Sequence, residues 1–209
     1  MEQLTDQYQD ILPPGLYLAL GNHSDQYTES LLSAREADEY RRMQHAGRKD
    51  EFVSARGMIR RLADDIGMDG NAFEVHKDGL GKPFGIYEDR RYYLSLAHTG
   101  ETVLCAISSD IPIGIDLEPA GRPVDERLRD RILHPKERKK LKNVELIKIW
   151  TLKEALVKLE GTGLRNNLNE IVIRPQGKHA FNARLSDEKT ARICSFQHGG
   201  YWISVAFFQ

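Results

Sequence analysis

Two carboxylates that could share one ligand stand two residues apart in the stretch 111–119, which reads IPIGIDLEP. They are Asp116 and Glu118, and aliphatic residues alternate with them in the period-two pattern of a half-buried strand. Residues two apart on a strand share a face, so these side chains lie next to each other with no cation between them. Because like charges repel, the pair requires solvent or a bound cation to offset its charge.

An acidic and a basic side chain, Glu154 and Lys158, follow in the segment 145–164, ELIKIWTLKEALVKLEGTGL. Leucines at helical spacing predict an amphipathic helix that ends near Gly161 and Gly163. The charged pair lies one turn apart and away from the apolar stripe, where such pairs are commonly only surface salt bridges. If the helix packs beside the carboxylate strand, three carboxylates surround one point. Such a group suits a hard cation such as Mg²⁺, completed by phosphate oxygens and water.

Together the two stretches resemble the signature of the 4′-phosphopantetheinyl transferases, specifically the surfactin-synthetase-activating type. The family pattern is a G-[IV]-D-x-E strand followed, some tens of residues later, by a [FW]-[ST]-x-K-E-[AS]-x-x-K helix. Either motif alone is a weak signal, but here both occur in the right order and spacing. The matching residues are Gly114, Ile115, Asp116, Glu118, Trp150, Thr151, Lys153, Glu154, Ala155 and Lys158.

The resemblance implies transfer of 4′-phosphopantetheine from coenzyme A to a serine of an acyl or peptidyl carrier protein. This reaction of the holo-[acyl-carrier-protein] synthase type converts the apo carrier to the holo form and releases 3′,5′-ADP. The metal ligands would be Asp116, Glu118 and Glu154, binding Mg²⁺ or alternatively Mn²⁺ against the coenzyme's pyrophosphate. Lys158 would contact coenzyme A and neutralise charge on the transferred phosphate. The general base would be Glu137 or a metal-adjacent carboxylate acting through water.

Glu137 follows Leu133 by four residues, where the family has an F-x-x-x-E context, so the glutamate is retained and the aromatic is not. The preceding segment 124–133, predicted to be helical, is rich in arginine, and a further helix is predicted to start at Pro135. A basic run is ordinarily a solvated face. A carrier protein is acidic around its serine, so this run could also steer it electrostatically. The arginines of this segment are Arg127, Arg129 and Arg131.

Four residues of the first half are predicted to anchor coenzyme A. Arg48 and Arg56 lie beside the apolar face of a helix predicted over 48–66, where they could simply extend along that face or capture phosphate. The family places a basic residue of this region near the 3′-phosphate of coenzyme A. Lys82 and Pro83 follow a glycine-rich turn and match the family's G-K-P element, which contacts the nucleotide end of the coenzyme.

The stretch SLAHTG at 95–100 joins strands predicted at 92–95 and 102–108, with a hairpin turn at its Thr-Gly. It resembles the family's [FN]-[IL]-S-H-[ST]-G element. His98 matches the histidine that contacts the phosphates of the cofactor. Ala97 stands where a serine is usual, so a hydroxyl donor is missing and a backbone N–H is the alternative phosphate ligand at this position.

The composition excludes several classes of protein. The chain has 209 residues with 30 Lys plus Arg against 31 Asp plus Glu, and lacks the basic excess of a general nucleic-acid binder. Cys105 and Cys194 are its only cysteines, so neither a disulfide framework nor a zinc site is indicated. The N-terminus does not read as a secretory signal, and no stretch approaches the length of a membrane helix. We therefore expect a cytoplasmic protein with no membrane or nucleic-acid partner.

The order of predicted elements suggests two related halves, because helices followed by strands occur over 1–108 and again over 109–209. This order fits the α+β fold of the family. In that fold two similar halves, each an antiparallel sheet plus helices, are related by a pseudo-two-fold axis, and the active site lies in the cleft between them. One chain then supplies both sides of the site, which favours a monomer.

Two other functions could use the same residues. A Mg²⁺-dependent phosphohydrolase acting on a nucleotide would consume coenzyme A without a protein acceptor. A non-catalytic module that binds coenzyme A or a carrier protein would not require three metal ligands, so the carboxylates together with Lys158 argue against it. Fatty-acid, polyketide and peptide-synthetase carriers are all compatible with the sequence, and so is acylated coenzyme A.

Overall fold

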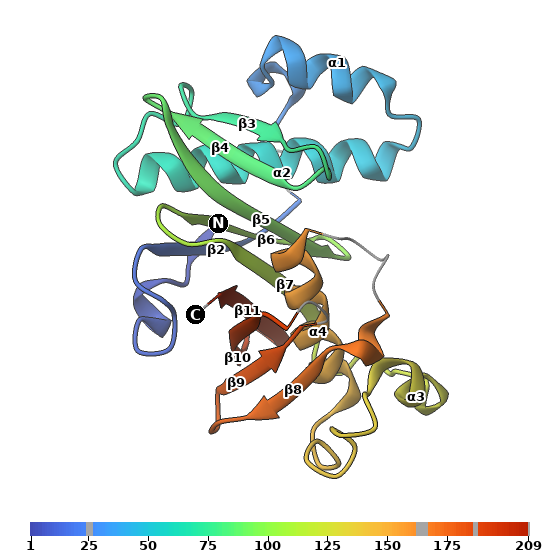
Figure 1. The fold of residues 1–209 in the computed structure, drawn as a ribbon. Helices are drawn as coiled ribbons and strands as arrows, with labels where there is room; N and C mark the ends of the chain where they lie inside the picture. The colour runs from blue at the N-terminus through green and yellow to red at the C-terminus, as the bar shows by residue number, and fades with distance from the viewer. Residues whose placement is uncertain (24–26, 162–166, 186–187, 209) are drawn as a thin grey trace.

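Two antiparallel sheets, each packed against one long helix, make up the fold (Figure 1). The computed structural model describes residues 1–23, 27–161, 167–185 and 188–208. The first sheet has the order β1 (Glu2–Gln3), β2 (Leu16–Asn22), β6 (Thr102–Ser108), β5 (Arg90–Thr99), β4 (Pro83–Tyr87) and β3 (Glu74–Lys77). The second has the order β7 (Ile113–Pro119), β11 (Tyr201–Phe208), β10 (Thr190–His198), β9 (Ala180–Arg184) and β8 (Val172–Pro175). The helices are α1 (Ala34–Arg42), α2 (Ala46–Asp65), α3 (Arg129–Ile132) and α4 (Leu146–Glu160), and the 3-10 turns are η1 (Asp6–Tyr8), η2 (Glu29–Leu31), η3 (Glu126–Leu128) and η5 (Leu168–Glu170).

Helix α1 begins at a capping box formed by Ser33 and Glu36. The Ser33 hydroxyl accepts from the Glu36 backbone N–H at 3.3 Å, and the Glu36 carboxylate accepts from the Ser33 N–H at 3.0 Å. The same carboxylate is buried and forms ion pairs with Arg56 at 2.8 Å and Arg60 at 2.5 Å, both on α2. One glutamate therefore starts α1 and holds it against α2.

The core consists of three apolar clusters. One lies between α2 and the first sheet, one between α4 and the second sheet, and one between the two sheets. Helix α2 covers the first sheet with Ile59, Leu62 and Ala63, each fully buried. Helix α4 covers the second sheet with the leucine stripe that predicted it. The middle cluster draws on β2, β5 and β6 from one sheet and on β7, β10 and β11 from the other, so the two sheets are held together by a continuous core.

The strand β7 has two faces with different partners. Its aliphatic residues, alternating along the strand, point into the cluster between the sheets. Its other face, which carries Gly114, Asp116 and Glu118, lies against α4. A Cβ added at Gly114 would lie 2.1 Å from the Ala155 carbonyl oxygen and 2.3 Å from the Leu159 nitrogen. The glycine therefore allows α4 to approach the strand closely enough to bring both motifs together.

Several sequence predictions are confirmed and some element boundaries change. Helix α4 ends at Gly161, whose φ of +75° is the left-handed conformation that glycine adopts readily; Gly163 lies outside the described residues. Strand β5 extends to Thr99, so the SLAHT residues lie on the strand and only the following turn is a loop. The helix predicted over 124–133 is reduced to η3 and α3, and the chain from Pro135 forms turns in place of a helix.

The mixed fold with two antiparallel sheets agrees with the predicted α+β class, while the pseudo-two-fold relation of 1–108 to 109–209 stays a prediction. Both cysteines are free and buried. None of the helices in the described residues combines the length and the apolar character that spanning a membrane demands.

Candidate functional site

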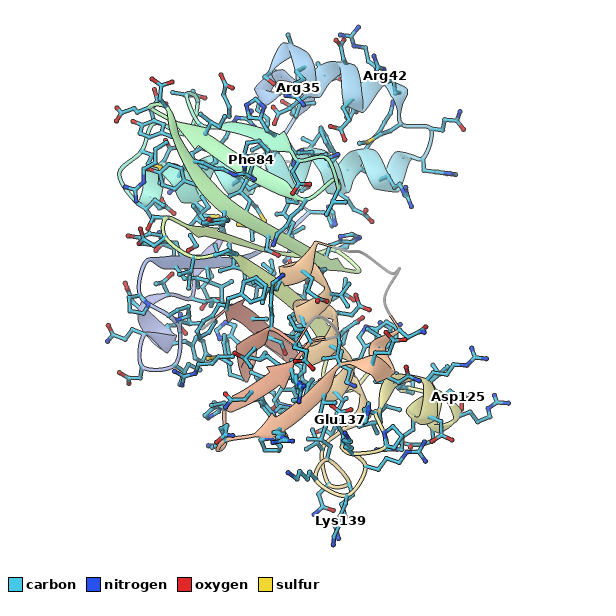
Figure 2. The ribbon with its side chains drawn as sticks, viewed as in Figure 1. Arg35, Arg42, Phe84, Asp125, Glu137 and Lys139 are labelled. Atoms are coloured by element: carbon cyan, nitrogen blue, oxygen red, sulfur yellow. The ribbon has the colours of Figure 1, made fainter. Side chains whose placement is uncertain are left out.

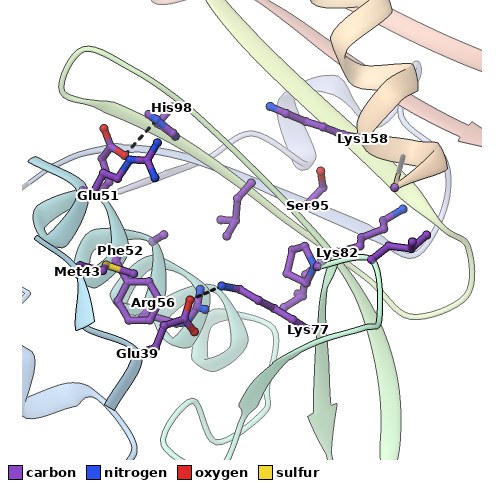
Figure 3. A pocket seen from close by; sticks show the side chains of 18 of the residues that line it. Glu39, Met43, Glu51, Phe52, Arg56, Lys77, Lys82, Ser95, His98 and Lys158 are labelled. Atoms are coloured by element: carbon purple, nitrogen blue, oxygen red, sulfur yellow. Dashed lines mark hydrogen bonds and ion pairs between the residues drawn. The ribbon is translucent and has the colours of Figure 1, made fainter. Parts of the chain in front are cut away.

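A pocket of about 1050 Å³ opens where the two halves of the chain meet (Figure 3). It is bounded by the start of α2, the turn between β3 and β4, the strand β5 and the last turn of α4. Six of the residues predicted to bind the coenzyme line it: Arg48, Arg56, Lys82, Pro83, His98 and Lys158. Residues that are distant in the sequence thus meet at one cavity, and α4 supplies its boundary from the second half.

The cations of the pocket differ in whether an ion pair within the protein already balances their charge. Arg56 is buried, pairs with Glu36 and lies over the Phe52 ring, with 4.4 Å between its guanidinium carbon and the ring centroid. Lys77, which the sequence analysis did not single out, pairs with Glu39. Arg48, by contrast, is exposed at the rim. Lys77 could have been found as the first basic residue of the glycine-rich turn.

Lys82 joins the two halves directly. Its Nζ donates to the Leu159 carbonyl at 2.6 Å, where the last turn of α4 leaves carbonyl groups without helical partners. Burial lowers the pKa of Lys82 to about 8, because the charged form loses hydration there. The ammonium therefore caps a helix end and faces the pocket at the same time.

Ala97 and His98, adjacent on β5, were both predicted to contact the coenzyme, but their side chains lie on opposite faces of the strand. His98 is exposed on the pocket side, and its Nε2 lies 3.2 Å from Glu51 Oε2 (Figure 3). Ala97 is 2% exposed and belongs to the cluster between the sheets. Neighbouring side chains on a strand point to opposite faces, so the prediction that Ala97 lines the cofactor site is corrected for its side chain.

The three predicted metal ligands lie near one another, close to the ammonium group of Lys158. Asp116 is 7% exposed, and its Oδ1 accepts from Lys158 Nζ at 2.8 Å. Glu118 Oε1 pairs with Arg122 at 2.5 Å, and its Oε2 accepts from the Thr99 hydroxyl at 3.3 Å. Asp116 Oδ2 and Glu154 Oε1 are buried without a hydrogen-bond partner. Two of the three carboxylates therefore present oxygens that the described protein groups leave unsatisfied.

The electrostatics of these carboxylates point to a missing positive charge. Burial raises the pKa of Asp116, Lys158 opposes the rise, and Glu118 adds to it by repulsion. The pKa of Glu154 is also raised, first by burial and then by the negative charge of Asp116. A bound cation would offset the repulsion between these carboxylates and favour their charged forms.

The arrangement is not a finished metal centre. Among the described residues, no three His, Cys, Asp or Glu side chains are close enough together to hold a metal ion as they stand. The oxygen donors nevertheless fit Mg²⁺ in type, and the orphaned oxygens on Asp116 and Glu154 fit a cation between them. Arg122, four residues after Glu118, was missed by the sequence analysis; its signal was a basic residue directly after the carboxylate strand.

Comparison with known proteins agrees with this geometry. Residues 112–206 match the sequence profile of the 4′-phosphopantetheinyl transferase superfamily, a range that contains β7, α4 and all three carboxylates. This part of the chain is therefore similar in sequence to that superfamily. The matched region therefore includes both sequence motifs, the one on β7 and the one on α4.

Three curated relatives carry the same family name. The Synechocystis sp. protein slr0495, provisionally named a 4′-phosphopantetheinyl transferase, is 28% identical over 197 residues, 86% of this chain and 80% of its own. The 4′-phosphopantetheinyl transferase gsp of Aneurinibacillus migulanus is 26% identical over 170 residues, 76% of this chain and 70% of its own. The 4′-phosphopantetheinyl transferase psf-1 of Bacillus pumilus is 28% identical over 123 residues, 56% of this chain and 47% of its own. The first two alignments extend well beyond the matched superfamily region.

The predicted base Glu137 lies elsewhere. It is fully buried in the second-sheet half (Figure 2), where its carboxylate accepts from Lys153 Nζ and the His134 N–H, each at 2.7 Å, and from the Ile173 N–H. Each oxygen has a partner and none is open to a substrate. The structure thus places Glu137 in a buried hydrogen-bond network and not among the residues that line the pocket.

The basic segment of the second half is exposed but partly neutralised. Arg127 pairs with Asp125 at 2.6 Å, and Arg129 pairs with Glu126 at 2.6 Å. Arg131 is exposed on α3. The three arginines of segment 124–133 are matched by three acidic residues, Asp125, Glu126 and Asp130, so the formal net charge of the segment is zero.

Proposed function

We propose that this protein transfers the 4′-phosphopantetheine group of coenzyme A to a serine hydroxyl of an acyl or peptidyl carrier protein and releases 3′,5′-ADP. One observation supports this most directly: Lys158 lines the pocket and also contacts Asp116, so a polyanion site and a carboxylate site share a side chain. The superfamily match and the names of the relatives favour the same reaction. Coenzyme A is the substrate in this proposal.

Binding of coenzyme A would use the cations that face the pocket. Arg48, Lys82 and His98 would hold the phosphates of the nucleotide end, with the guanidinium offering a planar fork of donors. The apolar part of the lining, including Phe52 and Leu80, would cover the base ring. The pyrophosphate would then extend towards Lys158 and the carboxylates.

The chemistry is phosphoryl transfer, in which positioning and charge neutralisation dominate. A Mg²⁺ ion bound by Asp116, Glu118 and Glu154 would draw charge from the pyrophosphate. Lys158 would neutralise charge that develops on the transferred phosphate. Glu154, the carboxylate on α4, would take the serine proton through water. The metal ligands, the base and Lys158 thereby come from two elements, β7 and α4.

The decisive experiment is intact-mass measurement of several apo carrier proteins after incubation with this protein, coenzyme A and Mg²⁺. We expect a gain of one phosphopantetheinyl group that disappears with EDTA, with Ser→Ala in the carrier, and with Asp116→Ala in the enzyme. Asp116→Ala that still transfers at saturating Mg²⁺ would refute the metal assignment. Consumption of coenzyme A without any carrier would indicate a phosphohydrolase, and bound but unreacted coenzyme A would indicate a binding module.

A further inference from the structure

Each of the two adjacent carboxylates of β7 is already held by a cation from the chain. Lys158, on the last turns of α4, contacts Asp116 at 2.8 Å, and Arg122, just after β7, contacts Glu118 at 2.5 Å. Their side chains are 31% and 51% exposed, whereas the two carboxylates are each 11% exposed. The anions are thus fixed and buried while their counter-ions reach solvent.

We propose that Lys158 and Arg122 occupy the place of the divalent cation in the free protein and leave when that cation binds. Lys158 is then transferred from Asp116 to a phosphate of the ligand in the pocket. The proposal rests on the proposed function, because it assigns the carboxylates to a divalent cation and the pocket to a phosphate compound. It adds that metal binding itself prepares the anion site.

The contacts of Lys158 favour such an exchange. Its ammonium has Asp116 as its single hydrogen-bonding partner within the described parts of the chain, and it sits on a flexible stem that already lines the pocket. Asp116 Oδ2 and Glu154 Oε1 are meanwhile buried and have no hydrogen-bond partner among the described residues. A single ammonium leaves these oxygens unsatisfied, whereas a divalent ion accepts several oxygen ligands at once.

The exchange has a thermodynamic consequence. The ion pair between Lys158 and Asp116 competes with binding of the metal to Asp116. It also competes with binding of phosphate to Lys158. Metal and phosphate ligand should therefore each raise the affinity for the other, by the same factor, as linkage requires. Part of this coupling passes through the protein and does not need the metal and the phosphate to touch.

The test is binding of Mn²⁺ alone, measured from the loss of its free electron paramagnetic resonance signal, with no coenzyme present. We expect Lys158→Met to bind Mn²⁺ about tenfold more tightly than the wild type, within the usual range of coupling between sites. Lys82→Met is the matched control. It removes a charge from the same pocket without touching a carboxylate, since Lys82 donates to the Leu159 carbonyl, and it should leave Mn²⁺ affinity within about twofold. Asp116→Asn should lose Mn²⁺ binding.

Equal Mn²⁺ affinity of the wild type and Lys158→Met would overturn the exchange, and so would an equal gain in Lys82→Met, which would reveal a general charge effect. These outcomes do not depend on transfer to a carrier. If wild-type protein modifies apo carriers but Lys158→Met gains no Mn²⁺ affinity, the exchange is wrong and the transferase assignment stands. If Lys158→Met gains Mn²⁺ affinity but wild-type protein modifies no carrier, the assignment fails and the exchange remains.

Discussion

Two lysines five residues apart on α4 have opposite environments. Lys153 is fully buried, and its Nζ donates to Glu137 and to the carbonyls of Ile132, Leu168 and Ile171 at 2.6 to 3.0 Å. Lys158 is 31% exposed and contacts one carboxylate, beside oxygens that have no partner. Both lysines belong to the same family motif. The groups around Lys153 are all hydrogen-bonded to one another, whereas carboxylate oxygens beside Lys158 have no partner among the described residues.

The difference separates a structural charge from a functional one. Lys153 and Glu137 join α4 to the end of α3, to η5 and to β8, so their network fixes the helix that carries Glu154. A buried ion pair of this kind contributes specificity of arrangement more than net stability, and breaking it is costly. Lys158 and its neighbours lack such closure within the described residues, and in the proposed function their remaining partners belong to a ligand. In that proposal the satisfied buried charges hold the site and the unsatisfied ones bind the ligand.

The largest effect should come from opening the closed network. Lys153→Met leaves the Glu137 carboxylate buried without its cation and should lower the free energy of unfolding by about 3–5 kcal/mol, measured by urea denaturation. Lys158→Met serves as the control and should change it by less than about 1 kcal/mol, since its pair is partly exposed. A Lys153→Met protein as stable as the wild type would remove the distinction between the two lysines.

Lys158→Ala should reverse this pattern. We expect the rate of carrier modification to fall by about 10²- to 10³-fold, the usual effect of removing one group that stabilises transition-state charge, while the unfolding midpoint barely moves. Lys158→Arg should recover part of the rate because it restores the positive charge. Proportionate losses of activity and stability in Lys158→Ala would instead identify an ordinary structural salt bridge.

The third prediction concerns pH and Lys82, which shares features of both lysines. Phosphate binds the ammonium form, so affinity for 3′,5′-ADP should fall as pH rises through about 8, approaching tenfold by pH 9. Stability should change in the opposite direction. The folded pKa lies below the unfolded value, the unfolded chain binds more protons between the two, and stability from this group therefore rises with pH there. Titration calorimetry at pH 7 and 9 should show the affinity loss, and Lys82→Met should abolish it.

The smallest effect should come from the exposed basic segment. Neutralising Arg127 and Arg131 to Gln should raise the KM for carrier protein by about two- to fivefold and leave the KM for coenzyme A unchanged, because rim charges mainly steer association. The control is Arg174→Gln with Arg184→Gln, two exposed arginines of β8 and β9 on the second sheet. An unchanged carrier KM, or an equal change in the control, would rule out docking at this segment.

The sequence predicted much of the fold because its strongest signals are local. The leucine stripe of α4 and the alternation of β7 each depend on residues close together in the chain, and the structure confirms both. The helix predicted to start at Pro135 was wrong, because the conformation of this segment depends on a contact with a residue distant in the sequence. A helix start was predicted from local preferences, but the Glu137 side chain turns into the core to meet Lys153, and the chain follows it.

The site shows the same division. Motif residues gave the pocket cations and the carboxylates, whose types and spacing are readable directly. The burial of Glu137 and Ala97 was not readable, because it depends on which face of a strand or loop meets a distant element. Lys153 carried a signal that could have been used: it stands four residues after Ile149 and three before Leu156, on the buried face. A lysine on an apolar stripe predicts a buried partner.

The close approach of α4 to β7 has a consequence for mutational scanning. Gly114 contacts the helix backbone and carries no group that could react, yet any side chain there would push α4 away from the strand that carries Asp116. A displacement of about 1 Å can cost roughly a hundredfold in rate. In a saturation library selected for activity, Gly114 should therefore be as intolerant as the carboxylates themselves, and a ranking by tolerance alone would not distinguish a spacer from a ligand.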